Sequence, residues 1–325
     1  VLVSNGGLFT VDENATLGDG GAGKITVSGP GSKWTVDDVE VGVYRNPTSY
    51  PDGRGDVIVE GGGAIEATSM QLGFLATGFP NRYLVDGTLL VTGQGSSVTL
   101  TGDLIVGNGG NGIATIANGG SVSASAVSIA TNESDGTGTL IFGAAANQSA
   151  VAAGTLDAPT VTFGIGTGEI VFNHTGNLTF APAVSGFGAI SVLAGTTTFA
   201  TDSAAFLGNV DVTGGKAVIN ADYSSAAVEV SGGGIVGGDG TVVSLDVLSG
   251  GTVAPGNSPG TMHVIEGVDV RCGLGVRGRG CRSTGGLDLC GLCRAQRRHG
   301  RGLGLAVADA LHDPDVDDGH HGDRL

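Results

Sequence analysis

The sequence lacks the features of several common protein classes. No cysteine occurs before Cys272, which excludes a disulfide framework for most of the chain. It has only 9 prolines in 325 residues, and its 63 glycines follow no strict triplet, so collagen and a proline-rich linker are excluded. No run of apolar residues reaches the ~18 that a membrane-spanning helix requires. Aromatic residues make up 5% of the chain, yet the apolar content of 40% is enough for a core.

Basic residues are also scarce, and their distribution is uneven. Residues 1–270 hold 24 Asp/Glu against 6 Lys/Arg, a net charge of −18, whereas residues 271–325 hold 7 against 9, or +2. An acidic body repels phosphate backbones and anionic lipid, so nucleic acid is not expected as a partner. The same charge helps to keep an extended β protein soluble.

One short glycine phrase returns at a nearly fixed interval between residues 191 and 264. Its copies are Val192-Leu-Ala-Gly, Val212-Thr-Gly-Gly, Val230-Ser-Gly-Gly and Leu248-Ser-Gly-Gly, and the last three are evenly spaced. Apolar and polar residues alternate after each copy, which is the period of a β-strand. A fixed period with this alternation predicts a solenoid in which the glycines form stacked corners. We therefore predict an all-β, parallel, right-handed β-helix with coils of about 18–20 residues, each containing about three short strands.

Residues 1–145 carry a longer version of the same pattern. Gly29-Pro-Gly-Ser-Lys-Trp34 matches Gly93-Gln-Gly-Ser-Ser-Val98 at an offset of 64. Phrases with a Gly-Gly pair, beginning at residues 5, 60 and 118, recur at offsets of 55 and 58. Each of these units is expected to span about three coils, given the coil length of about 18–20 residues.

Two proline-containing segments interrupt these repeats, from Tyr44 to Arg54 and from Ala76 to Arg82. Proline cannot sit inside a stacked central strand, so we expect both segments to project from the coil. The glycine phrase weakens between residues 138 and 206, but alternation persists there, as in Glu169-Ile-Val-Phe. The coils are therefore expected to continue.

A resemblance to a known family is carried by residues 168–198. They include Gly168-Glu-Ile-Val-Phe-Asn-His-Thr-Gly-Asn-Leu-Thr-Phe-Ala-Pro-Ala-Val-Ser-Gly-Phe-Gly and Val192-Leu-Ala-Gly-Thr-Thr-Thr, and they resemble passenger domains of bacterial autotransporters, the type V secretion class. The phrase Gly250-Gly-Thr-Val-Ala-Pro-Gly-Asn-Ser-Pro-Gly-Thr is similar to the hallmark that precedes the C-terminal region of that family. The resemblance, including autotransporter-associated β-strand repeats, covers roughly residues 1–264.

This resemblance implies a non-catalytic passenger that forms a β-helical rod, with adhesion as its expected function. It implies display at the bacterial cell surface or outer membrane, or secretion, and host or cell-surface ligands that the sequence does not identify. It also implies an outer-membrane translocator barrel outside this chain. A long cysteine-free body suits an exported protein that stays unfolded while it crosses an envelope. We expect no cofactor.

The chain changes character after Val264. Residues 271–325 contain 9 Arg and all four cysteines, and β-alternation ceases. We therefore predict three regions: a β-helix of longer glycine-rich repeats over 1–145, a β-helix of autotransporter-associated repeats over 146–264, and an irregular tail over 265–325. An abrupt rise in Arg, Gly, Cys and His is typical of GC-rich DNA read out of frame, so a frameshift is our hypothesis for the tail.

The sequence predicts no catalytic, cofactor-binding or metal-binding residues. Cys290-Gly-Leu-Cys293 has zinc-knuckle spacing, and four histidines follow it, namely His299, His312, His320 and His321. Cys272 and Cys281 are nine residues apart rather than three, which favours an incidental tail.

Other motifs have an equally plain interpretation. Arg54-Gly-Asp56 is either an integrin-type recognition tripeptide on the projecting loop or the start of a strand. Asp239 and the run Gly107–Gly112 match only one imperfect copy of a calcium-binding repeat, so we interpret them as turns. His174 is expected at the surface or at a corner, and Trp34 is expected to pack on or beside a coil.

The alternative function is a carbohydrate-active β-helix enzyme, of the lyase or glycosidase kind. Such sites need clustered carboxylates, often with Arg or Lys. The six Lys/Arg of residues 1–270, and the lack of carboxylates paired at a coil offset, argue against it. A truncated, non-functional fragment is the third interpretation.

Overall fold

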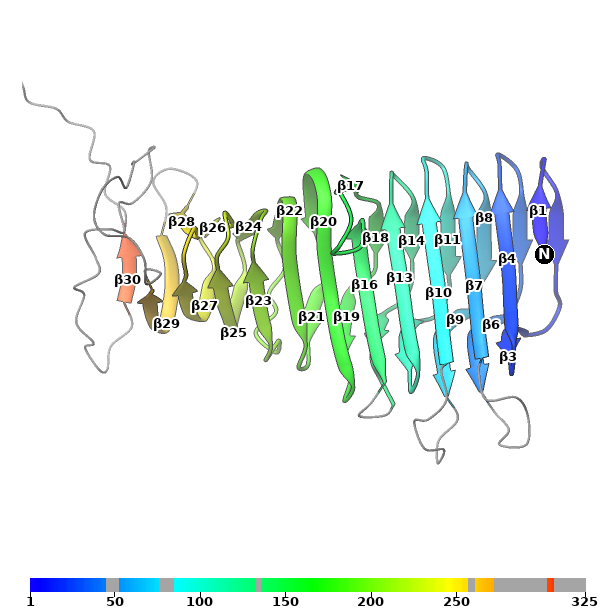
Figure 1. The fold of residues 1–325 in the computed structure, drawn as a ribbon, viewed down its shortest axis with the longest axis horizontal. Coiled ribbons are helices and arrows are strands. Elements are labelled where there is room, and N and C mark those ends of the chain that lie inside the picture. Colours follow the sequence, from blue (N-terminus) through cyan, green and yellow to red (C-terminus); the bar gives the residue numbers. More distant parts are fainter. Residues whose placement is uncertain (45–52, 76–84, 133–135, 257–260, 272–302, 307–325) are drawn as a thin grey trace, which may run out of the picture.

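The computed structural model describes residues 1–44, 53–75, 85–132, 136–256, 261–271 and 303–306 (Figure 1). These residues form one elongated stack of β-strands that runs from β1 at the N-terminal end to β29 at the other (Figure 1). Almost all neighbouring strands pair in parallel, so the chain is a parallel β-helix, as the repeats predict. The two proline-containing segments lie mostly outside the described residues, at 45–52 and 76–84.

Sheet A contains 17 strands and runs the whole length of the stack. Its strands are β1 (Leu2–Ser4), β4 (Ala22–Ser28), β7 (Gly53–Glu60), β10 (Val85–Thr92), β13 (Asn111–Ala117), β16 (Thr137–Gly143), β17 (Val151–Ala152), β20 (Thr167–Phe180), β22 (Ala189–Phe199), β23 (Asn209–Val212), β24 (Lys216–Ile219), β25 (Asp222–Val230), β26 (Ile235–Gly238), β27 (Thr241–Val247), β28 (Thr252–Pro255), β29 (Thr261–Val270) and β30 (Leu303–Ala306).

Sheets B and C cover the other faces of the first coils and end earlier. Sheet B consists of β2 (Leu8–Thr10), β5 (Lys33–Thr35), β8 (Ala64–Ala67), β11 (Ser97–Leu100), β14 (Ser121–Ser123) and β18 (Thr155–Asp157). Sheet C consists of β3 (Ala15–Asp19), β6 (Asp38–Tyr44), β9 (Ser69–Leu75), β12 (Leu104–Asn108), β15 (Val127–Ile129), β19 (Thr160–Phe163) and β21 (Ala183–Ser185).

The length of a coil changes along the stack. In residues 1–168, called the long-coil part, the step between paired residues of sheet A ranges from 24, between Leu2 and Thr26, to 32, between Ile25 and Val57. Coils of this length are common among solenoid repeats. In residues 169–270, called the short-coil part, the steps fall to 20 between β20 and β22 and to 18 between β23 and β25. The predicted coil length therefore describes the short-coil part, and the prediction is wrong for the long-coil part.

The repeats of residues 1–145 correspondingly span two coils, where three were expected. Trp34 pairs with Ile65, and Ile65 pairs with Val98, so the match at an offset of 64 joins every second coil. The error follows from transferring the coil length of the short repeat to a region where sheets B and C add residues to each coil.

The core is a set of ladders in which inward-facing apolar side chains stack on one another. The longest runs through sheet A and consists of Val3, Val27, Val59, Val91, Ile116, Phe142, Phe172, Val192, Val212, Val230 and Val247. All of these side chains are buried. β-Branched residues suit a parallel sheet that is packed on its inner face, and each buried Val contributes roughly 1.5–3 kcal/mol.

A second ladder, at the edge of the core, is made of glycine. It consists of Gly23, Gly55, Gly87, Gly112, Gly138 and Gly168, which are partners in successive coils. The bent backbone of sheet C approaches this ladder closely: a Cβ atom on Gly112 would lie 2.0 Å from the backbone nitrogen of Gly107. At Gly112 no larger residue fits, since the three nearest atoms all belong to the backbone, whereas at Gly168 the nearest atoms belong to the side chains of Phe163 and Ile129.

Aromatic rings fill the core where the two parts meet. Phe142 stacks on Phe172 with ring centroids 5.1 Å apart, and Phe172 contacts Phe180 and Phe199 edge-on at 5.3 and 5.6 Å. Phe199 continues to Tyr223 at 5.7 Å. These bulky rings fill the core at the level where the cross-section of the rod changes from long coils to short coils.

The last coil extends past the boundary expected at Val264. β29 continues to Val270, and its final residues pair in parallel with β27. β30 pairs antiparallel with the start of β29. The described residues include no helix with the length and apolar character to cross a membrane.

Candidate interaction surface

Parallel pairing in register also stacks the outward-facing side chains of sheet A. One outward row carries apolar side chains as far as the junction: Ile58 and Leu90 are partly exposed, whereas Ile141 and Val171 are buried. Thr26 and Thr115 belong to the same row. In the short-coil part the same row turns polar and then acidic. The chemical character of one face therefore changes along the rod.

The acidic row is defined by Asp211, Glu229, Asp246 and Asp269, which are partners in four successive coils. Neighbouring strands lie about 4.8 Å apart, so each carboxylate has a like charge beside it. Burial raises the pKa of Asp211, the charge of Glu229 raises it further, and a hydrogen bond from Asn209 Nδ2 lowers it.

The acidic row corrects the expectation that no carboxylates pair at a coil offset. Its offsets differ from one coil to the next, so a search at one fixed period misses the row. The row lies on the outer face of a sheet. Within the described residues, no group of three or more His, Cys, Asp or Glu is arranged to hold a metal ion.

Large apolar side chains are exposed at one corner of the rod near the junction of its two parts. This apolar corner consists of Ile165, Phe187 and Leu207, whose exposed fractions are 70%, 71% and 58%. Phe187 and Leu207 lie in adjacent coils, because Leu207 N donates to Gly186 O at 2.9 Å and Gly186 pairs with Phe206. Adjacent exposed apolar side chains of this size are typical of contact surfaces.

His174 lies at a corner, as predicted, but it is completely buried, so the alternative of a surface position is wrong. Its Nε2 atom lies 3.0 Å from Thr197 Oγ1, and burial lowers the pKa of its imidazole. The neighbouring Asn173 donates from Nδ2 to Ala145 O and Gln148 O at 2.8 and 2.9 Å. Both residues fix the corner of β20.

Trp34 packs in the core as predicted. It is 1% exposed, and its ring stacks on Phe9 with centroids 6.3 Å apart. Arg54 and Asp56 lie within β7, and Thr88 Oγ1 donates to Asp56 Oδ1 at 2.8 Å. The tripeptide is therefore part of a paired strand rather than a projecting loop.

The remaining predicted motifs lie at or beside turns, or outside the described residues. Asp239 follows β26 directly, which agrees with its interpretation as a turn residue. In the run Gly107–Gly112 only Gly109 and Gly110 lie between strands, and the rest belongs to β12 and β13. The four cysteines and His299 lie outside the described residues.

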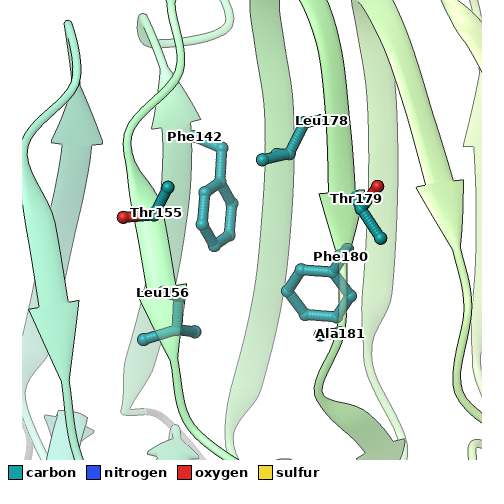
Figure 2. A pocket seen from close by; sticks show the side chains of 7 residues that line it. All are labelled: Phe142, Thr155, Leu156, Leu178, Thr179, Phe180 and Ala181. Atoms are coloured by element: carbon teal, nitrogen blue, oxygen red, sulfur yellow. The ribbon is translucent and has the colours of Figure 1, made fainter.

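The described part of the rod has cavities at its first coil and at its junction. One, of about 270 Å³, lies at the first coil and is lined in part by Phe9, Ile25 and Trp34. The other, of about 160 Å³, lies at the junction and is lined by Phe142, Phe180 and neighbouring residues (Figure 2). Neither contains a carboxylate or a histidine, so neither offers an acid–base pair.

The chain is similar to the Adhesin BmaC autotransporter of Brucella suis biovar 1 (strain 1330). The identity is 42% over 223 residues, which is 66% of this chain. The chain spans only 6% of the length of that protein. No family model matches the chain, and no solved structure matches it.

Proposed function

We propose that the chain is an autotransporter-type passenger segment that acts as a non-catalytic adhesive rod at the bacterial cell surface. Its sequence relationship and its parallel β-helix support this proposal. The observation that carries the proposal is the 42% identity over 223 residues to an autotransporter adhesin, in a chain whose described residues form a continuous stack of strands. A rod presents long faces on which many weak contacts add up to avidity.

The apolar corner is the part of the surface best suited to adhesion. Its three side chains project at adjacent coils from a surface that is otherwise rich in Thr, Ser and carboxylates. Phe187 is the strongest candidate, since aromatic side chains supply large contact areas at interfaces. The host or cell-surface ligand is a partner that bears an apolar depression to receive it.

Adhesion is tested with beads that carry the purified chain. Beads are incubated with epithelial monolayers and with immobilised matrix proteins, and bound beads are counted after washing. We expect more bound beads than with albumin, and a large loss for the Phe187→Ser/Leu207→Ser double variant. The matched control is Leu8→Ser, which removes a 77%-exposed leucine at the far end of the rod. Binding equal to that of albumin on every surface would contradict the proposal.

The carbohydrate-active enzyme remains the alternative, and the acidic row is the observation that bears on it. Paired carboxylates are the machinery of glycoside hydrolysis. Here they lie on an open face, and the row would repel an anionic polyuronide. Incubation with neutral glycans and polyuronides, followed by an assay for new reducing ends or unsaturated products, separates the two functions. Turnover that is lost in Asp211→Asn/Glu229→Gln would establish the enzyme.

A further inference from the structure

The rod has a break in one of its sheets at the junction of its two parts. Figure 2 shows the cavity there, the junction cleft, between β18 on one side and the second half of β20 on the other. Its lining consists of Phe142, Thr155, Leu156, Leu178, Thr179, Phe180 and Ala181. Sheets A and C continue through this level, because β16 pairs with β20 and β19 pairs with β21. Only sheet B stops.

Both rims of the junction cleft are strand edges without a described partner. β18 is the last strand of sheet B and pairs only with β14 among the described strands. Residues 177–180 of β20 pair with β22 on one side, while the pairing of β20 with β16 and β17 ends at Thr175. Two open edges therefore face each other across a cavity.

The hydrogen-bond pattern identifies which backbone groups face the cleft. Thr155 N donates to Gly120 O, and Asp157 O accepts from Ala124 N, so both residues point toward β14. Alternate residues of a parallel strand direct their N–H and C=O to opposite sides, so those of Leu156 face the cleft. On the other rim, Phe180 O accepts from Ala200 N in the β22 direction, so the backbone of Thr179 faces the cleft.

The floor of the junction cleft is apolar and small. Phe142 and Phe180 meet edge-on there with centroids 5.7 Å apart, and Leu156 and Leu178 are only partly buried. The volume of about 160 Å³ is well below the roughly 300 Å³ at which pockets for drug-sized ligands begin. It has room for one or two aliphatic side chains. Thr155 and Thr179 are exposed at the rims.

We propose that the junction cleft binds an extended segment of a partner polypeptide, which adds a strand between β18 and β20 and completes the sheet. Backbone hydrogen bonds to Leu156 and Thr179 supply affinity, and apolar side chains at every second position of the segment enter the floor. The segment carries basic rather than acidic residues, since residues 1–270 have a net charge of −18. This inference deepens the proposed function because it names a class of ligand for the adhesive rod. To that extent the inference rests on the proposed function.

The probe is a fluorescein-labelled peptide, Lys-Thr-Val-Thr-Val-Thr-Lys, titrated with the full chain and followed by fluorescence anisotropy. We expect saturable binding. A second probe carries an N-methyl group on its central threonine, and this change should weaken binding at least about tenfold because it removes a backbone donor. Equal binding of the two probes would overturn the proposal, and so would an absence of binding at a chain concentration of about 1 mM.

A variant locates the binding. Leu156→Trp fills the cleft and should abolish binding, whereas the control Thr99→Trp places the same ring on the exposed side of β11 in the same sheet and should leave binding unchanged. Far-ultraviolet circular dichroism checks the fold of both variants. Binding that survives Leu156→Trp, or a dimer in sedimentation that this substitution dissociates, would overturn the proposal in favour of another edge or a second copy.

The bead assay separates this inference from the proposed function. Adhesion without peptide binding would remove the junction cleft and leave the adhesive rod in place. Peptide binding without adhesion would support the junction cleft as a binding site and would contradict the adhesive rod.

Discussion

The long-coil and short-coil parts both stack parallel strands in register, but they differ in coil length and in what restricts their residues. In the long-coil part, sheets B and C lengthen each coil, and the backbone of sheet C presses on the glycine ladder. In the short-coil part, successive coils such as those of β23 and β25 are much shorter, and the inner row is almost entirely valine. Backbone crowding therefore restricts which residues can occupy the glycine ladder of the long-coil part, whereas side-chain size restricts which residues can occupy the core of the short-coil part.

The outer faces differ as well. The outward row of sheet A is a mixture of threonine and apolar side chains up to the junction and becomes the acidic row in the short-coil part. At the junction, the aromatic cluster, the buried His174 and the open edges of the cleft come together. One continuous stack can thus carry distinct surfaces, because in-register pairing places residues of successive coils beside one another.

The largest expected effect tests whether backbone crowding limits the long-coil part. Gly112→Ala places a Cβ atom 2.0 Å from Gly107 N, and because the atoms in its way are backbone, the corner between β12 and β13 must move to relieve the clash. We expect a loss of more than about 5 kcal/mol in the free energy of unfolding, measured by chemical denaturation.

The matched control is Gly21→Ala, where an added Cβ meets no atom within 4 Å. Its effect should stay within about 0.5 kcal/mol. If Gly112→Ala were equally mild, the ladder would not depend on glycine.

The next effect tests whether aromatic packing joins the two parts. Phe172→Ala removes a ring that contacts Phe142, Phe180 and Phe199, and it leaves a cavity in a closely packed core. We expect a loss of about 3–5 kcal/mol. Val228→Ala, in the short-coil part, should cost less because it deletes fewer buried atoms. A split melting curve for Phe172→Ala, seen by calorimetry, would show that the two parts unfold separately.

The sequence reveals the kind of fold more readily than its dimensions. Alternation and stacked glycine corners suffice to predict a parallel β-helix, and the match of Trp34 with Val98 suffices to predict a packing role. The length of a coil in the long-coil part cannot be predicted from the repeat, since a repeat of two long coils has about the same number of residues as three short coils. The acidic row has unequal offsets, so no single period exposes it.

Two further features depend on register rather than composition. His174 is buried because the corner of β20 turns its ring toward Thr197, which local sequence does not show. The junction cleft exists because β18 and β20 fail to pair, although the strands on either side remain in register. Both are visible only once the strands are placed.

A smaller effect concerns pH at the junction. Burial lowers the pKa of His174 below its ordinary 6.5. As the pH falls below about 6.5, the unfolded chain takes up a proton that the folded chain does not, so stability declines until the folded pKa is reached. His174→Gln should remove this decline, which amounts to a few degrees in Tm. Thermal melts between pH 7.5 and 5 measure it. An identical decline in the variant would assign it to another group.

The smallest effect tests whether the acidic row strains the short-coil part. Because burial and Glu229 raise the pKa of Asp211, the folded chain binds its proton more tightly than the unfolded chain. The ionised carboxylate therefore destabilises the fold at neutral pH, and this cost disappears as the pH falls below the ordinary value of 3.8. Asp211→Asn should raise the free energy of unfolding by about 0.5 kcal/mol at pH 7, since half-exposed charges are screened, and by nothing at pH 3. The control Asp239→Asn removes an exposed carboxylate outside the row and should not raise the free energy of unfolding at pH 7. A gain for Asp211→Asn that persists unchanged at pH 3 would show that the side chain acts through packing rather than through its charge.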